Sequence, residues 1–263
     1  MNLRFSRKQL SIPYAVFLLC FVVAPLLVIL SYAFTNGEGR FTMQNFLGFF
    51  ESPNTIGTLC YSLAVAVAVT ICCTLVAYPV AYILAKSQIK RKAILLLLFI
   101  APMWINFTLR VVALKEVLTM LEGNLAYHPF FNTVLGMTYD FLPFMILPLY
   151  TTLSKLDDSY LEAAADLGAN AALTFLKVTL PLSVPGLISG VTMVFLPSMT
   201  NYVILDMLYN STYIMGSLIG SYFNAYDWHS GSMISIVLLV IIFILTWVTN
   251  GFGEEETNRG AIL

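Results

Sequence analysis

The sequence predicts an all-α polytopic membrane protein with six transmembrane helices. Of its 263 residues, 59% are hydrophobic and 10% are charged, and the mean hydropathy is +0.84. So few charges cannot cover the surface of a water-soluble domain, and so much apolar sequence exceeds the needs of one core. The apolar residues also gather into runs of the roughly 20 residues that a helix needs to cross a bilayer.

Six apolar runs set the expected order of spans and loops. We expect spanning helices over residues 13–34, 57–85, 93–114, 132–153, 178–205 and 232–252. They define an N-terminal segment (1–12), a first helix with its loop (13–56), a five-helix core (57–252) and a C-terminal tail (253–263). The uncharged run 9–37 is longer than the ~7–15 residues of a cleaved signal peptide, so the first helix should stay in the protein.

The Lys and Arg residues predict the orientation in the membrane. Ten of the 13 lie in the N-terminal segment, the second-to-third loop, the stretch 154–177 and the tail, whereas Arg40, Arg110 and Lys115 lie in the alternate segments. We expect the chain to lie in the inner (cytoplasmic) membrane of the cell. Because Lys and Arg concentrate on the cytoplasmic side, both termini and residues 154–177 should face the cytoplasm.

The stretch 154–177 is polar and should form two short helices. Asp157 or Asp158 can cap the first helix, because a carboxylate there accepts hydrogen bonds from unpaired backbone N–H groups. Gly168 stands where a left-handed residue would end that helix, and Asn170 can cap the second.

Acids line one face of the first of these helices. Asp158, Glu162 and Asp166 are spaced i, i+4, i+8, so neighbouring charges repel each other unless a basic partner is present. A helix lying on the bilayer surface is the alternative, but such helices carry Lys and Arg on their polar face. The pattern therefore favours docking to a basic protein surface.

Prolines are frequent inside the expected spans, at positions 79, 102, 143, 148, 181, 185 and 197. We expect Pro181 and Pro185 to break the second short helix, because proline removes a helical hydrogen bond. Each proline also frees a carbonyl that lipid cannot satisfy, so these spans should face protein or a watery path. This favours a translocation pathway over a passive anchor.

A short motif in this region resembles a known family. Glu162-Ala163-Ala164, Gly168, Val178 and Leu180-Pro181 resemble the EAA loop of ATP-binding-cassette (ABC) importer permeases, with Val178 where the family has Ile. The resemblance implies the type I, MetI-like permease fold, with the loop docked on an ATPase subunit. The coupling residues it implies are Glu162, Ala163, Ala164, Gly168, Leu180 and Pro181, and the acidic face of the first short helix adds Asp166.

A second resemblance indicates the cargo. Segments 142–157, 161–175, 196–199 and 227–228 are similar, in order, to the PotB family of spermidine/putrescine permeases, and the match covers most of 57–252. It implies polyamine transport together with a second permease (PotC-like), two ATPase subunits (PotA-like) and an extracytoplasmic binding protein (PotD-like). Asp140 stands where that family has an apolar residue, so the resemblance assigns it no role.

Charged and aromatic residues suggest a path for a cationic amine. Asp140 lies inside the fourth span, where a charge costs about 2.5 to 3.5 kcal/mol, so it should either face the path or pair with Arg110. Residues 205–231 contain acids and aromatics but no Lys or Arg. Acids and aromatic faces both attract ammonium groups. The candidates are Asp140, Tyr202, Asp206, Tyr209, Asp227 and Trp228.

Several function classes are disfavoured. The chain has no phosphate-binding G-x-x-x-x-G-K-[ST] loop, no catalytic constellation and no metal-ligand spacing, and its four cysteines lie in apolar runs. We therefore expect a non-catalytic subunit with no cofactor and no metal. Its net charge of −1 offers no case for nucleic acid.

Two alternatives remain. One is a related importer for iron, sulfate, molybdate or phosphonate, although an anion would require basic residues in the pore. The other is an ion-coupled secondary transporter that uses Asp140 as its ion site, although no inverted repeat is visible.

Overall fold

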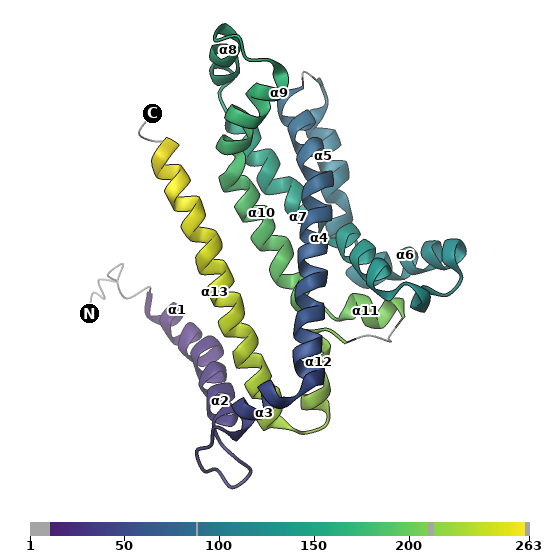
Figure 1. The fold of residues 1–263 in the computed structure, drawn as a ribbon, viewed down its shortest axis with the longest axis vertical. Helices are drawn as coiled ribbons and strands as arrows, with labels where there is room; N and C mark the ends of the chain where they lie inside the picture. Colours follow the sequence, from purple (N-terminus) through teal and green to yellow (C-terminus); the bar gives the residue numbers. More distant parts are fainter. Residues whose placement is uncertain (1–10, 88, 210–212, 261–263) are drawn as a thin grey trace, which may run out of the picture. The chain divides into compact units, whose positions relative to one another are not determined.

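The computed structural model describes residues 11–87, 89–209 and 213–260. Within these ranges the structure is helical, and its only β-type pairing is an isolated bridge between Thr35 and Phe41. The chain divides into two compact units, each built of the helices labelled in Figure 1. The first comprises Met1–Thr58 and Ser217–Ile241, and the second comprises Leu59–Gly216 and Ile242–Leu263.

The first unit begins with a long apolar helix and a short amphipathic one. Its elements are α1 (Ser11–Leu18), the π-turn η1 (Leu19–Val23), α2 (Ala24–Ala33), α3 (Gln44–Glu51), most of α12 (Met215–Asn224) and the first part of α13 (Trp228–Gly260). The Asn45 amide donates to the carbonyls of Ala33 and Thr35, at 2.9 and 3.0 Å. These bonds fasten α3 to the end of α2.

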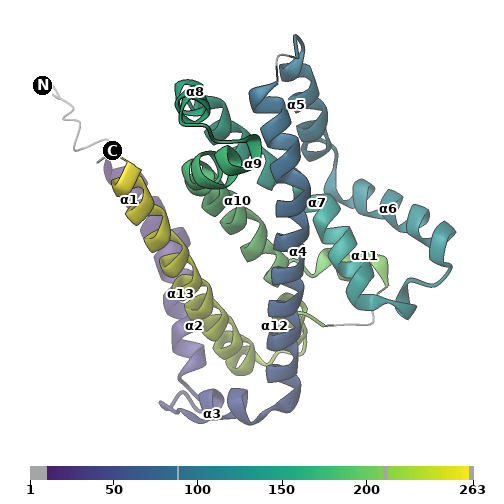
Figure 2. The ribbon, with the colours of Figure 1, turned by 45° about the horizontal axis from the view of Figure 1, so that its top comes forward.

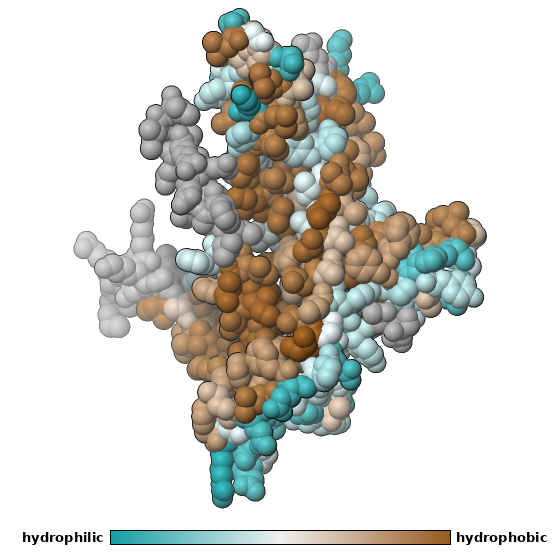
Figure 3. All heavy atoms as spheres, in the orientation of Figure 1, coloured by the Kyte–Doolittle hydropathy of each residue, from teal (hydrophilic) through white to brown (hydrophobic). Residues whose placement is uncertain are grey.

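The second unit holds the core of the protein. Its elements are most of α4 (Pro53–Lys86), α5 (Lys92–Ile100), η2 (Ala101–Trp104), α6 (Phe107–Glu122), η3 (Leu125–Tyr127), α7 (Pro129–Lys155), α8 (Ser159–Asp166), α9 (Ala171–Thr174), η4 (Phe175–Thr179), α10 (Leu180–Thr200), α11 (Val203–Leu208) and the end of α13. Its fully buried side chains include Met137, Met145, Ile146 and Leu149 of α7. On the visible face, hydrophobic residues cover much of α4 and α10, and hydrophilic residues gather around α8 (Figure 3).

The expected all-α membrane fold is confirmed. Continuous apolar helices long enough to span a bilayer run over Ile12–Ala33, Pro53–Lys86, Pro129–Lys155, Ala171–Thr200 and Trp228–Trp247. A bent pair, Lys92–Trp104 with Phe107–Glu122, brings the number of spans among the described residues to six if it crosses as one. The fifth helix ends at Thr200, earlier than expected, and α11 follows after a two-residue break.

The prediction of the third span as a single helix over 93–114 was wrong. The chain turns by 97° between α5 and α6, and Figure 2 shows α6 leaving the direction of α5. Pro102 lies in the 3₁₀ turn η2, and Ile105 is extended with ψ 141°. The Asn106 side chain then accepts the N–H of Thr108 at 2.9 Å, which caps α6 as a new helix.

The expected break at Pro181 and Pro185 was also wrong. Residues Ala171–Thr200 form one helical span. The turn before Pro181 is a π-turn, in which Leu180 N–H donates to the carbonyl of Phe175, five residues back. Pro181 then lies in the first turn of α10, directly after this π-turn, and Pro185 is accommodated inside the helix.

The helices α7 and α10 pack closely because glycine faces the contact. A Cβ on Gly186 would lie 2.5 Å from Thr152 Oγ1 and 2.9 Å from the carbonyl oxygen of Pro148. A Cβ on Gly190 would lie 2.5 Å from Met145 Sδ. The backbone of α10 thus lies against α7 with no room for a side chain at these positions.

We predict that Gly186→Ala lowers the stability of the subunit. The new Cβ would overlap backbone that cannot move aside, and overpacking of this kind costs ~1–3 kcal/mol. Thermal unfolding of the purified subunit in detergent should show a lower midpoint. Gly57→Ala on α4, where a Cβ meets nothing within 4 Å, is the matched control. Equal midpoints for the two variants would contradict the packing argument.

Candidate coupling loop and substrate path

The EAA loop (154–177) begins with two aspartates that have different partners. Asp157 Oδ1 accepts the N–H of Ser159 at 2.9 Å and so caps α8. This backbone bond, with help from the Ser159 side chain, lowers the pKa of the Asp157 carboxyl. Asp158 makes no capping bond, and its Oδ1 instead lies 2.6 Å from Lys86 Nζ at the end of α4.

Gly168 adopts the left-handed conformation expected of it, with φ 77°. Its N–H donates to the carbonyl of Ala165, and the N–H of Ala169 donates to that of Ala164, at 2.9 and 3.0 Å. Asn170 Oδ1 then accepts the N–H of Leu173 at 2.9 Å, which caps α9 as expected. Two short helices therefore follow each other around a tight turn that favours glycine.

The outward side of the loop is acidic and partly apolar. Glu162, Ala163 and Asp166 are exposed, and neither acid has an ion pair among the described residues. Ala164 is buried, whereas Leu167 beside it is 89% exposed. Of the remaining motif residues, Leu180 is half-buried and Pro181 is exposed. The loop therefore presents carboxylates and a large apolar side chain to its surroundings.

Contacts between α4 and the loop were missed in the sequence analysis. Lys86 Nζ donates to the carbonyl of Leu156 at 2.7 Å as well as to Asp158. The Phe175 ring meets Tyr78 and Tyr82 edge-on, with centroids 5.5 and 5.9 Å apart. Positions 78, 82 and 86 are spaced i, i+4, i+8, and this spacing was the available signal that they share one helix face.

Asp140 is engaged in a buried ion pair. Its Oδ1 lies 2.6 Å from Arg110 Nη2, and the two side chains are 5% and 7% exposed. The pair joins α6 to α7 across the core of the second unit. The Arg110 Nε and Nη1 atoms have no hydrogen-bond partner among the described residues. The carboxylate of Asp140, which the sequence suggested as a substrate contact, is therefore already paired with Arg110.

The short helix α11 carries two of the path candidates. Asp206 is exposed, and Tyr202, which precedes the first helical residue, is 38% exposed. Partial burial raises the pKa of the Asp206 carboxyl, which lies outside the spanning helices. Tyr209 is instead tied to α7, because its hydroxyl donates to the carbonyl of Pro129 at 2.8 Å and contacts Thr133 Oγ1.

Asp227 and Trp228 belong to the first unit, whereas the other path candidates belong to the second. Asp227 Oδ1 accepts the N–H of Ser230 at 3.0 Å, which caps the start of α13. Trp228 packs against Phe223 and Tyr226, with ring centroids 5.5 and 6.4 Å apart. Trp228 as a whole is 45% exposed, so part of its surface remains accessible.

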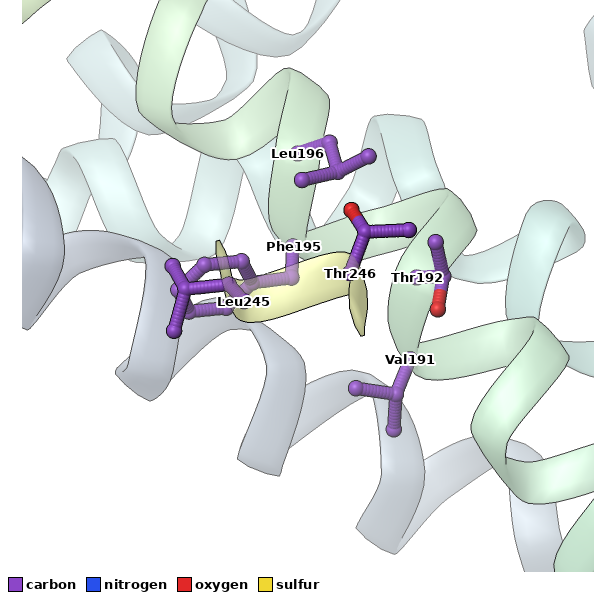
Figure 4. Close-up of a pocket in the computed structure, with 6 residues that line it drawn as sticks. All are labelled: Val191, Thr192, Phe195, Leu196, Leu245 and Thr246. Carbon is purple, nitrogen blue, oxygen red and sulfur yellow. The ribbon is translucent and has the colours of Figure 1, made fainter. Parts of the chain in front are cut away.

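A cavity of about 170 Å³ lies between α10 and α13 of the second unit (Figure 4). Val191, Thr192, Phe195, Leu196, Leu245 and Thr246 line it. The hydroxyls of Thr192 and Thr246 donate to carbonyls of their own helices, at 2.9 and 2.8 Å. With no acid in its wall, this cavity suits an apolar group and does not suit an ammonium ion.

Three comparisons relate the chain to known proteins. The chain is 34% identical to the spermidine/putrescine transport system permease protein PotB of Haemophilus influenzae, covering 94% of this chain and 93% of that protein. It is 32% identical to PotB of Escherichia coli, covering 88% and 92%. Its fold is similar to a chain of a bacterial alginate ABC transporter solved in complex with an alginate pentasaccharide-bound periplasmic protein. The TM-score is 0.73 at 12% identity, covering 94% and 93%.

The family assignment rests on the core of the chain. The family described as binding-protein-dependent transport system inner membrane component matches residues 77–253, which include the EAA loop and α11. The structural likeness confirms the expected ABC importer permease fold, and the apolar helices fit a multi-pass inner-membrane protein. The chain therefore belongs to the family of binding-protein-dependent transport system inner membrane components.

Proposed function

We propose that this chain is the permease subunit of an ATP-driven importer for polyamines of the spermidine/putrescine class. The observation that carries the proposal is its 34% identity to a PotB permease over 94% of the chain. Identity at this level spans both units, not the shared motif alone. The subunit would form half of the translocation pathway and would leave ATP hydrolysis to separate chains.

The exposed side of the EAA loop supports docking to an ATPase. Glu162 and Asp166 are exposed acids beside the large apolar side chain of Leu167, a combination that suits a basic cleft with an apolar floor. The cytoplasmic orientation proposed from the Lys and Arg distribution places this surface where ATPase subunits reside. The full complex would contain a second permease, two ATPase subunits and an extracytoplasmic binding protein.

The mechanism follows from these attachments. Closure of the ATPase dimer on ATP would displace the EAA loop, and the loop would move the spans that carry it, so that the path opens alternately to the two sides. Glu162, Ala163, Ala164, Asp166, Gly168, Leu180 and Pro181 are the residues we assign to this coupling. The left-handed turn at Gly168 fixes the angle between α8 and α9, so that both helices move together.

For the cargo path we propose Asp206 and Tyr202 as the principal contacts. A carboxylate attracts an ammonium group by about 4 kcal/mol at 4 Å in a surface environment of effective dielectric ~20, before desolvation. This is enough to guide a polycation that must also be released. The partly exposed Trp228 can assist by cation–π contact, and Asp227 can assist by charge. Tyr209 and Asp140 contribute chiefly to the packing of the helices. Tyr209 contacts α7, and Asp140 pairs with Arg110 of α6.

The cargo itself can be tested with the assembled complex. We predict that proteoliposomes holding this chain, its second permease, its ATPase and its binding protein import radiolabelled spermidine or putrescine only when ATP is present. Molybdate, sulfate and ferric iron should not compete. ATP-dependent uptake of one of these ions instead would overturn the polyamine assignment. Ion-driven uptake by the chain alone would point to a secondary transporter.

We predict that Asp206→Asn weakens delivery of the cargo. An exposed charge interaction is worth roughly 0.2–1 kcal/mol, so the half-saturating polyamine concentration should rise by roughly 1.4- to fivefold. Membrane abundance should stay constant. Glu38→Gln, which removes an exposed carboxylate from the loop after α2, is the matched control. A fall in abundance with unchanged apparent affinity would make Asp206 a structural residue.

We predict that Glu162→Lys weakens assembly with the ATPase. Reversing an exposed acid that faces a basic surface replaces attraction by repulsion. Co-purification of the ATPase should fall, and an acid introduced into the ATPase cleft should restore it. Glu116→Lys, which changes another exposed acid on α6, should leave co-purification unchanged. An unaltered complex for Glu162→Lys would rule out this pairing.

A further inference from the structure

One face of α4 contacts both ends of the EAA loop. Tyr78, Tyr82 and Lys86, which we call the α4 stripe, are one helical turn apart. Lys86 contacts the chain where α7 ends and α8 begins, and the two tyrosines contact it where α9 ends. Figure 1 shows the last turn of α4 at the same end of the second unit as α8 and α9.

Lys86 joins three helix ends through one ammonium group. Its Nζ lies 2.7 Å from the carbonyl of Leu156, the residue that ends α7, and 2.6 Å from Asp158 Oδ1 at the start of α8. The Lys86 side chain is 12% exposed, whereas that of Asp158 is 74% exposed. A cation beside the terminal carbonyls of α4 and α7 is also favoured by the helix dipoles.

The tyrosines hold the other end of the loop. The Phe175 ring lies edge-on to Tyr78 and Tyr82, with interplanar angles of 84° and 89°. Tyr78 Oη and Ser183 Oγ of α10 lie 2.7 Å apart in a buried hydrogen bond. Phe175 is the first residue of the π-turn η4, so these contacts fix the point where the loop passes into α10.

We infer that the α4 stripe is a coupling element, in which Lys86 and Tyr82 position the EAA loop so that its displacement also moves α4. Covalently, the loop is connected only to α7 and α10. Charge-assisted hydrogen bonds and partly buried ring contacts resist separation, so a push on α8 would reach α4 as well. The inference rests on the proposed function, because it assumes that the loop is moved by an ATPase.

The test compares Lys86→Met with Lys86→Arg in the complete importer. Met keeps the length of the side chain without its charge, and Arg keeps the charge. In proteoliposomes, Lys86→Met should retain basal ATP hydrolysis within twofold and lose at least fivefold of the stimulation by the loaded binding protein. Uptake per ATP should fall to the same extent. Lys86→Arg should retain at least half of both.

A second variant removes one of the two ring contacts and leaves Lys86 in place. Tyr82→Leu should lower the stimulated but not the basal hydrolysis, whereas Tyr139→Leu on the 42% exposed Tyr139 of α7 should change neither. Wild-type stimulation in Lys86→Met, or a parallel loss of basal activity, stimulation and complex yield in all variants, would overturn the inference. A wild-type complex that responds to its binding protein but imports no polyamine would refute only the cargo assignment.

Discussion

The absence of water in the bilayer core is the constraint on which the rest of this structure depends. Every backbone N–H and carbonyl there must bond within the protein, so the chain can leave the helical form only where other groups take over. The break between α5 and α6 has Asn106 to cap the new helix, and the π-turn before Pro181 keeps Leu180 bonded to Phe175. At both of these places in the described part of the chain, irregular backbone has a partner built in.

Charged side chains inside the protein also need partners, as the backbone groups do. The buried carboxylate of Asp140 has a cation 2.6 Å away, because an isolated charge in such surroundings would be far more costly than a paired one. Asp158 and Asp227 also have partners. Asp158 forms an ion pair with Lys86, and Asp227 caps the start of α13. The exposed acids of α8 and α11, Glu162, Asp166 and Asp206, are the principal ones that the proposals assign to partners and cargo.

Features with a local cause could be predicted from the sequence. The prediction of a left-handed Gly168 was correct because it concerned only the backbone conformation of that residue. The pairing of Asp140 with Arg110 was one of the two options considered, because a buried charge needs a partner. The bend at Ile105 was missed, although Pro102 and Asn106 signalled it, because a search for long apolar runs averages over such breaks. The contact of Lys86 with Asp158 joins residues 72 positions apart, and no local pattern encodes that distance.

The glycine contact between α7 and α10 limits how these helices can move. Sliding α10 along α7 by one position would bring the side chain of Leu187 or Pro185 to the place of Gly186, where even a Cβ would lie 2.5 Å from Thr152 Oγ1. Interlocked surfaces of this kind resist translation but allow the pair to tilt as one body. Alternating access in this subunit would then proceed by rocking of an intact α7–α10 pair, with the rearrangement taking place at its outer edges.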